Sequence, residues 1–154
     1  MTETAPAPET MHPDELAAAC AKEMWSADKA SRHMGMHLDE IRAGYARMSM
    51  VVQDHMTNGH DICHGGFVFT LADSAFAFAC NSYNQNAVAQ HCAISFLQPV
   101  MSGETLTAVA KEIHKAGRSG IYDIRVTRAD GETVAEFRGH SRTVKGTRLP
   151  AQER

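Results

Sequence analysis

The distribution of hydrophobic residues predicts one long buried helix in the middle of the chain. The segment GGFVFTLADSAFAFACNS, at positions 65–82, carries apolar side chains on every side of a helical wheel. That pattern is typical of a helix buried all round. A strand is disfavoured because the segment is long and rich in alanine. We therefore expect a helix that is too short and too interrupted to span a bilayer.

Alternating polar and apolar residues predict strands on both sides of this helix. One strand is expected over 45–52, preceded by another near 37–42, and the four that follow the helix are 87–98, 104–114, 119–128 and 132–143. The dipeptide Asp130-Gly131 is a strong hairpin signal between the last two. Short connections predict an antiparallel meander of the four later strands. The predicted fold class is α+β, with an antiparallel sheet wrapped around one long buried helix.

The two ends of the chain offer little to bury. Residues 1–11 are rich in Ala, Pro, Thr and Glu, which predicts a disordered lead-in. Pro13 suits the first position of a helix that ends near Trp25. We expect residues 12–146 to form a single domain and 147–154 to be a frayed tail.

Composition narrows the classes of function. A chain of 154 residues is the size of one domain and buries enough surface for a core without disulfides. Fifteen scattered Lys and Arg against 18 Asp and Glu, a net charge of −3, argue against nucleic-acid binding. No apolar run has the length of a membrane helix, and the first residues lack the pattern of a secretory signal. Four cysteines without CxxC spacing suit reduced thiols, so a cytoplasmic location is expected.

The polar stretch before the long helix holds the candidate chemistry. Gly65 and Gly66 place backbone N–H groups at a helix N-terminus, where an oxyanion or carbonyl oxygen can approach closely. A plain tight turn into the helix explains the two glycines equally well. The chain contains none of the GxSxG, GxGxxG, Walker or HExxH motifs.

The remaining polar residues of this stretch leave alternatives open. Asn58 either caps the loop or holds a substrate or water, and His64 packs against or caps the helix entry. His60, Cys63 and His64 lack a fourth donor at zinc-ligand spacing, so we expect no metal. Cys63 as a nucleophile beside His64 has no third group to orient it.

Asp73 is the only acidic residue of the apolar helix. Desolvation there would raise its pKa and make it a better base, which is the mark of a functional carboxyl group. The alternative is a carboxylate satisfied by Thr70, Ser74 or the backbone. Seven residues separate Gly66 from Asp73, about 10 Å along the helix axis, so one chain cannot bring both to one reacting atom. A shared site requires two copies related by a two-fold axis.

Residues 16–145 resemble the hotdog-fold acyl-CoA thioesterases, in the branch that acts in phenylacetate degradation. The likeness is carried by NGHDICHGG at 58–66, FTLAD ending at Asp73, FACNSYN at 78–84, ISFLQPV at 94–100 and GRSGIYDI at 117–124. It implies a hotdog fold that hydrolyses aryl-acyl-CoA thioesters such as (hydroxy)phenylacetyl-CoA without a cofactor. It also implies a homodimer that shares its active sites, assembled into a homotetramer of two back-to-back dimers.

The resemblance also implies roles for individual residues. Gly65 would donate its N–H to the thioester carbonyl, and Asp73 would be the nucleophile or the general base. Asn58 would help to place substrate or water, and His64 would shape the helix entry. Together with Gly66 and Arg118, which the residues themselves suggest, they are the predicted substrate-binding residues. The CoA phosphates need cations near the site mouth, and the candidates are Lys111, Lys115, Arg118 and Arg142. On charge alone each is more often a solvated surface residue, and Arg118 is preferred because glycines flank its loop. Some related enzymes place Ser or Thr on the strand after the helix to hold water, and residues 87–92 contain neither.

Three other functions stay open at this stage. They are a broad medium-chain acyl-CoA thioesterase, an enoyl-CoA hydratase of the same fold, and a binding module that holds acyl-CoA without turnover. Release of free thiol distinguishes hydrolysis from the last two.

Overall fold

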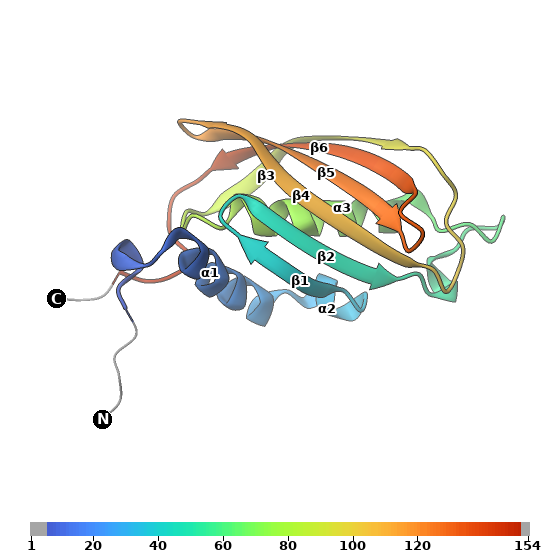
Figure 1. Cartoon of the computed structure of the whole chain (residues 1–154), viewed down its shortest axis with the longest axis horizontal. Coiled ribbons are helices and arrows are strands. Elements are labelled where there is room, and N and C mark those ends of the chain that lie inside the picture. The colour runs from blue at the N-terminus through green and yellow to red at the C-terminus, as the bar shows by residue number, and fades with distance from the viewer. Residues whose placement is uncertain (1–5, 152–154) are drawn as a thin grey trace, which may run out of the picture.

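A curved six-stranded antiparallel sheet wraps around a central helix in the computed structural model, which describes residues 6–151 (Figure 1). The strands are β1 (His37–Arg42), β2 (Tyr45–Val51), β3 (Ala87–Phe96), β4 (Thr105–Ala116), β5 (Ser119–Arg128) and β6 (Thr133–Thr143). The helices are α1 (Pro13–Ala27), α2 (Lys29–His33) and α3 (Gly65–Cys80), with short 3₁₀ turns at Pro8–Thr10 and Asp54–Met56. The predicted fold class is confirmed, and only α2 and the two 3₁₀ turns were not expected.

The order of strands in the sheet corrects the predicted meander. It is β1-β2-β4-β5-β6-β3, so β4, β5 and β6 follow one another while β3 pairs with β6 at the far edge. Glycines with positive φ at Gly117 and Gly131 close the two tight hairpins that hold β4, β5 and β6 together. Residues 97–104 form a longer connection from β3 to β4, and β2 takes the place beside β4. One side of β3 is therefore an unpaired edge of this sheet.

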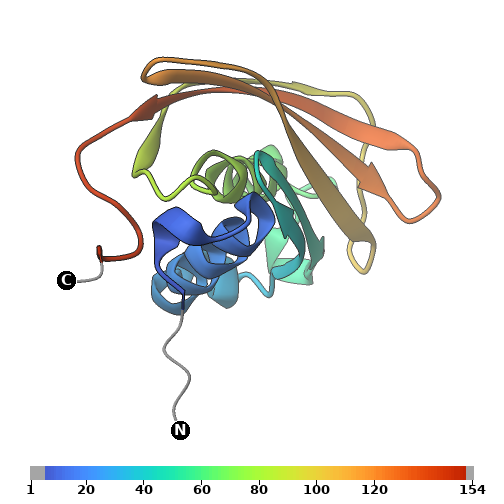
Figure 2. The ribbon, with the colours of Figure 1, turned by 60° about the vertical axis from the view of Figure 1, so that its left-hand side comes forward.

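Helix α1 covers α3 on the side away from most of the sheet (Figure 2). It begins in a capping box, because the His12 side chain accepts from the backbone of Asp14 and Glu15 accepts from that of His12. Near its end the Trp25 ring packs on Phe78 of α3, with ring centroids 6.1 Å apart.

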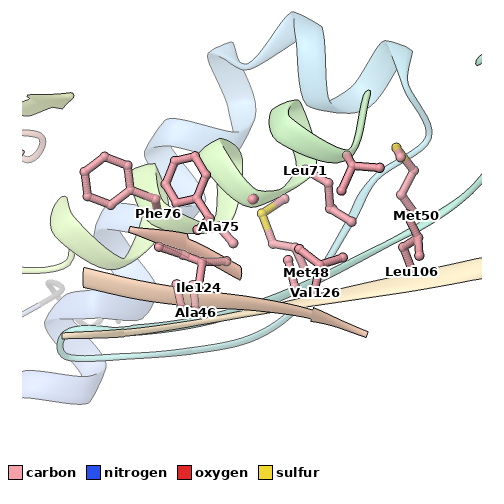
Figure 3. Packing of buried hydrophobic residues seen from close by; sticks show 14 of the residues in the cluster. Ala46, Met48, Met50, Leu71, Ala75, Phe76, Leu106, Ile124 and Val126 are labelled. Carbon is pink, nitrogen blue, oxygen red and sulfur yellow. The ribbon is translucent and has the colours of Figure 1, made fainter. Parts of the chain in front are cut away.

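The concave face of the sheet packs on α3 through large apolar side chains (Figure 3). Members of this cluster include Met48, Met50, Leu71, Phe76, Leu106, Ile124 and Val126. Gly139 on β6 permits the close approach, because a β-carbon there would lie 2.8 Å from the ring of Phe76. That ring is almost fully buried and has no room to move.

The expectation that α3 is buried on every side is wrong in the single chain. A stripe along the helix that includes Phe69, Asp73 and Ala77 is only half-buried. The reason is that β3 ends the sheet and no further element covers the helix beyond it, as far as residues 6–151 show. An apolar stripe and an open sheet edge thus lie together.

Residues 1–5 and 152–154 lie outside the described part of the chain, so the lead-in over 1–11 and the tail over 147–154 stay predictions. Within the described part of the tail, Arg148 donates to Oδ1 of Asn81 at 3.0 Å, and the backbone N–H of Leu149 donates to Asn84. No helix between residues 6 and 151 has the length and apolar character needed to cross a membrane.

Candidate active site

The N-terminus of α3 presents one backbone donor that the rest of the fold does not use. His64 is the N-cap residue, and its Nδ1 accepts a hydrogen bond from the N–H of Gly66 at 2.9 Å. This bond requires Nδ1 to be unprotonated. The N–H of Gly65 has no acceptor within residues 6–151. Of the two glycine amides, Gly65 is therefore the one available to a substrate oxygen.

The side chain of Phe96 lies over Gly65. A β-carbon added to Gly65 would lie 2.8 Å from Cζ of Phe96, so glycine is required for this approach. Beside them is a pocket of about 430 Å³. Its lining residues are Ile62, Cys63, Gly65, Val68, Phe96, Leu97, Gln98, Pro99, Val100 and Val134. The free amide of Gly65 thus opens into a mainly apolar pocket.

Asp73 is a half-buried carboxyl group without an internal partner. Burial raises its pKa above the ordinary value for aspartate. No hydrogen bond to its oxygens is formed by any residue from 6 to 151. Thr70 donates to the carbonyl of Gly66, and Ser74 pairs with Ser31. The alternative of a carboxylate satisfied by Thr70 or Ser74 is therefore not what the structure contains.

Two cysteines lie within the electrostatic influence of Asp73. Burial and, to a smaller extent, the Asp73 charge raise the pKa of the Cys92 thiol. The same causes act on Cys80, whose pKa rises to about 12. Both thiols are therefore protonated at neutral pH and are poor nucleophiles.

Asn58 organises the loop that leads to α3. Its Oδ1 accepts hydrogen bonds from the backbone N–H groups of His60 and Ile62, at 2.9 and 3.3 Å. Asp61 adopts a positive φ in this turn. Cys63 is buried, and burial raises the pKa of its thiol, so it is not an activated nucleophile. Over residues 6–151, no three His, Cys, Asp or Glu side chains are grouped to hold a metal ion.

A single chain gathers only His64, Gly65 and Gly66. Asp73 follows Gly65 by eight residues, which is about 12 Å along the axis of α3. Arg118 lies much farther away. Its Nε donates to the carbonyl of Thr143, and Thr143 pairs with Ala87, the first residue of β3. The last residue of β3, Phe96, lies against Gly65. The ten residues of β3 span about 30 Å, so Arg118 cannot reach Gly65 within one chain.

Sequence reasoning missed Phe96 and Cys92 as neighbours of the site. Cys92, Ile94 and Phe96 are alternate residues of β3 that face the concave side of the sheet. Their partners on β6 are the buried residues Gly139, Phe137 and Ala135. The alternation itself is visible in the sequence. Which end of α3 each residue meets follows only from the pairing of β3 with β6.

The fold and this helix N-terminus together define the class of protein. A sheet wrapped around a helix that carries a free glycine N–H and a desolvated carboxylate is the architecture of a hotdog thioesterase. The model of the thioesterase superfamily matches residues 60–135, from the loop before α3 into β6. The chain belongs to this superfamily and is a thioester hydrolase.

Individual relatives are similar over most of the chain. The acyl-coenzyme A thioesterase PaaI of Escherichia coli K12 is 43% identical over 127 residues, which cover 82% of this chain and 91% of that protein. The structure of the E. coli PaaI protein from the phenylacetic acid degradation operon superimposes with a TM-score of 0.87 at 41% identity, covering 88% of this chain and 99% of that one. The TT0310 protein of Thermus thermophilus has a TM-score of 0.74 at 32% identity, covering 76% and 98%.

Proposed function

We propose that this protein hydrolyses aryl-acyl-CoA thioesters, of the (hydroxy)phenylacetyl-CoA type, in phenylacetate degradation. The observation that carries the proposal is Asp73, a desolvated carboxylate without an internal hydrogen bond in the described residues, on the helix whose first residue offers a free N–H. Similarity to PaaI of E. coli supports an acyl-CoA substrate and a place in phenylacetate degradation. The four cysteines are free thiols, in keeping with a cytoplasmic enzyme.

The chemistry requires a polarised carbonyl and a base or nucleophile. The N–H of Gly65 would stabilise the oxyanion that forms on the thioester carbonyl. Along one route, Asp73 takes a proton from water while the water oxygen attacks the carbonyl carbon, and the CoA thiolate leaves and is protonated. Along the other, an Asp73 oxygen attacks directly and expels the thiolate, and water then hydrolyses the anhydride. Both routes yield a carboxylic acid and CoA.

The site would be completed by a second copy of the chain. The half-buried stripe of α3 and the unpaired edge of β3 lie on the same side of the molecule. An exposed strand edge is a ready surface for pairing with another strand. We propose that two β3 edges pair antiparallel about a two-fold axis, which brings Asp73 of one subunit toward Gly65 of the other. Burial at this interface would desolvate Asp73 further.

The same two-fold axis would bring Arg118 close to an active site, although Arg118 cannot reach Gly65 within one chain. Antiparallel pairing places the start of one β3 beside the end of the other, and Arg118 lies at that start. Arg118 would then reach the CoA phosphates at the neighbouring subunit's Gly65. Asn58 and His64, with Gly66 as the hydrogen-bond partner of His64, would hold the loop and helix entry in shape. Assembly of two such dimers into a tetramer rests on the family resemblance, and sedimentation velocity would test it.

The proposed function predicts rapid release of free CoA thiol from aryl-acetyl esters. Initial rates would be measured with a thiol-reactive dye for phenylacetyl-, hydroxyphenylacetyl-, benzoyl- and straight-chain acyl-CoA. We expect the highest kcat/KM with the ring-bearing acetyl esters. Equal rates across straight-chain esters and none with aryl esters would contradict the aryl assignment. Absence of release from every ester would contradict the thioesterase assignment itself.

A further inference from the structure

Phe96 lies directly beside the residue that carries the active-site amide. It is the last residue of β3, and its ring end lies 2.8 to 3.3 Å from the position that a β-carbon of Gly65 would occupy. The ring is therefore in van der Waals contact with Gly65 itself. A carbonyl oxygen held by the Gly65 N–H brings its attached groups into reach of this ring.

In the single chain this large apolar ring is also unusually exposed. Phe96 is 55% exposed, and Leu97 beside it is 52% exposed. Exposed large apolar side chains that cluster together mark surfaces that bind something. The adjacent pocket is also lined by buried or half-buried apolar residues, including Ile62, Val68 and Val100. At about 430 Å³ this pocket has the size of an ordinary small-molecule site.

We propose that Phe96 is the residue that selects aryl over straight-chain acyl groups. This inference rests on the proposed function. In an arylacetyl thioester the ring is one carbon away from the carbonyl, so an acyl group that enters the adjacent pocket from Gly65 would bring its ring within reach of Phe96. Paired aromatic rings attract each other beyond the burial of their area, with centroids about 4.5–7 Å apart. A straight acyl chain gains only from burial of its area.

The test is the ratio of kcat/KM for phenylacetyl-CoA to that for hexanoyl-CoA. Phe96→Leu keeps an apolar side chain but removes the ring, and we expect the ratio to fall by roughly three- to tenfold. Phe96→Tyr keeps the ring and should preserve the ratio. Ile113→Ala is the matched control, because Ile113 is 53% exposed on β4 and lies outside this pocket. Melting temperatures of all variants report whether they are folded.

Each result decides the inference. A falling ratio in Phe96→Leu alone supports selection by the ring. An unchanged ratio, or an equal loss with both esters, overturns it and leaves Phe96 a packing residue, while thioester hydrolysis stands. If the unaltered enzyme releases no thiol from either ester, the proposed function has failed and this inference fails with it.

Discussion

Replacing Asp73 with Asn is expected to lower kcat by about 10²- to 10⁴-fold, the range that a positioned general base contributes. The substitution keeps the size of the side chain and removes its ability to take a proton or to attack. No internal hydrogen bond is lost within residues 6–151, so the fold has no reason to change. Stopped-flow or dye-coupled measurement of thiol release gives kcat directly. Retention of more than about a tenth of the activity would remove Asp73 from the chemistry.

The same substitution is expected to stabilise the protein at neutral pH. Burial raises the pKa of Asp73, so the folded protein binds this proton more tightly than the unfolded chain does. The ionised carboxylate therefore has its full cost in stability above the folded pKa, and this cost decreases as the pH falls from that value and is gone below the lower pKa of the unfolded chain. We expect a higher Tm for Asp73→Asn at pH 7 and a smaller difference in acid. For the same reason, the acid limb of kcat/KM should lie above the ordinary pKa of aspartate.

The two chemical routes leave different isotopic labels. In a single turnover in heavy-oxygen water, attack by Asp73 followed by water attack on the Asp73 carbonyl of the anhydride would place label in the Asp73 carboxyl group. Direct attack by water would label only the acid product. Label in the peptide that contains Asp73, measured by mass spectrometry, would therefore identify the covalent route.

Gly65→Pro is expected to lower kcat by about 10²- to 10³-fold, the usual cost of removing one oxyanion donor. Gly65 is the first residue of α3, where proline is well tolerated because its missing N–H is not needed by the helix. His64 already has φ −60° and ψ 132°, an extended conformation that suits the residue before a proline. The variant therefore deletes the donor with little strain in the backbone.

Gly65→Ala is the matched control for this variant. It adds a β-carbon against Phe96, as proline does, but keeps the N–H. The exposed ring of Phe96 can swing aside, so both variants are expected to fold. The ratio of their kcat values isolates the donor from the steric change. Equal losses of kcat in both variants would show that the N–H of Gly65 does not stabilise the oxyanion.

Mixing inactive subunits tests whether the site is shared. Asp73→Asn and Gly65→Pro subunits, coexpressed in equal amounts, would form mixed dimers in half of all random pairings. Each mixed dimer has one site with both groups intact, so about a quarter of the unaltered activity should return. Absence of recovery would mean that Gly65 and Asp73 of one chain serve one site.

The positions of the elements and the key chemical groups could be predicted from the sequence. Helical and strand periodicities are local properties, so α3 and all six strands were predicted close to their observed bounds. An acidic residue in an apolar helix is equally visible along the chain, and burial does raise the pKa of Asp73. The separation of about 10 Å between Gly66 and Asp73 followed from the helical rise alone.

The tertiary structure decided which of these elements became neighbours. Alternation in β3 predicts a strand but does not encode its partner, and its pairing with β6 in place of β4 depends on contacts between residues far apart in sequence. That pairing leaves Asp73 half-exposed beside an open sheet edge and places Phe96 over Gly65. It also separates Arg118 from Gly65 by the length of β3. Residue types therefore determined the chemistry available to this protein. Long-range packing determined the position of each group, because the free energy of strand pairing depends on contacts across the whole sheet and not on the sequence of one segment.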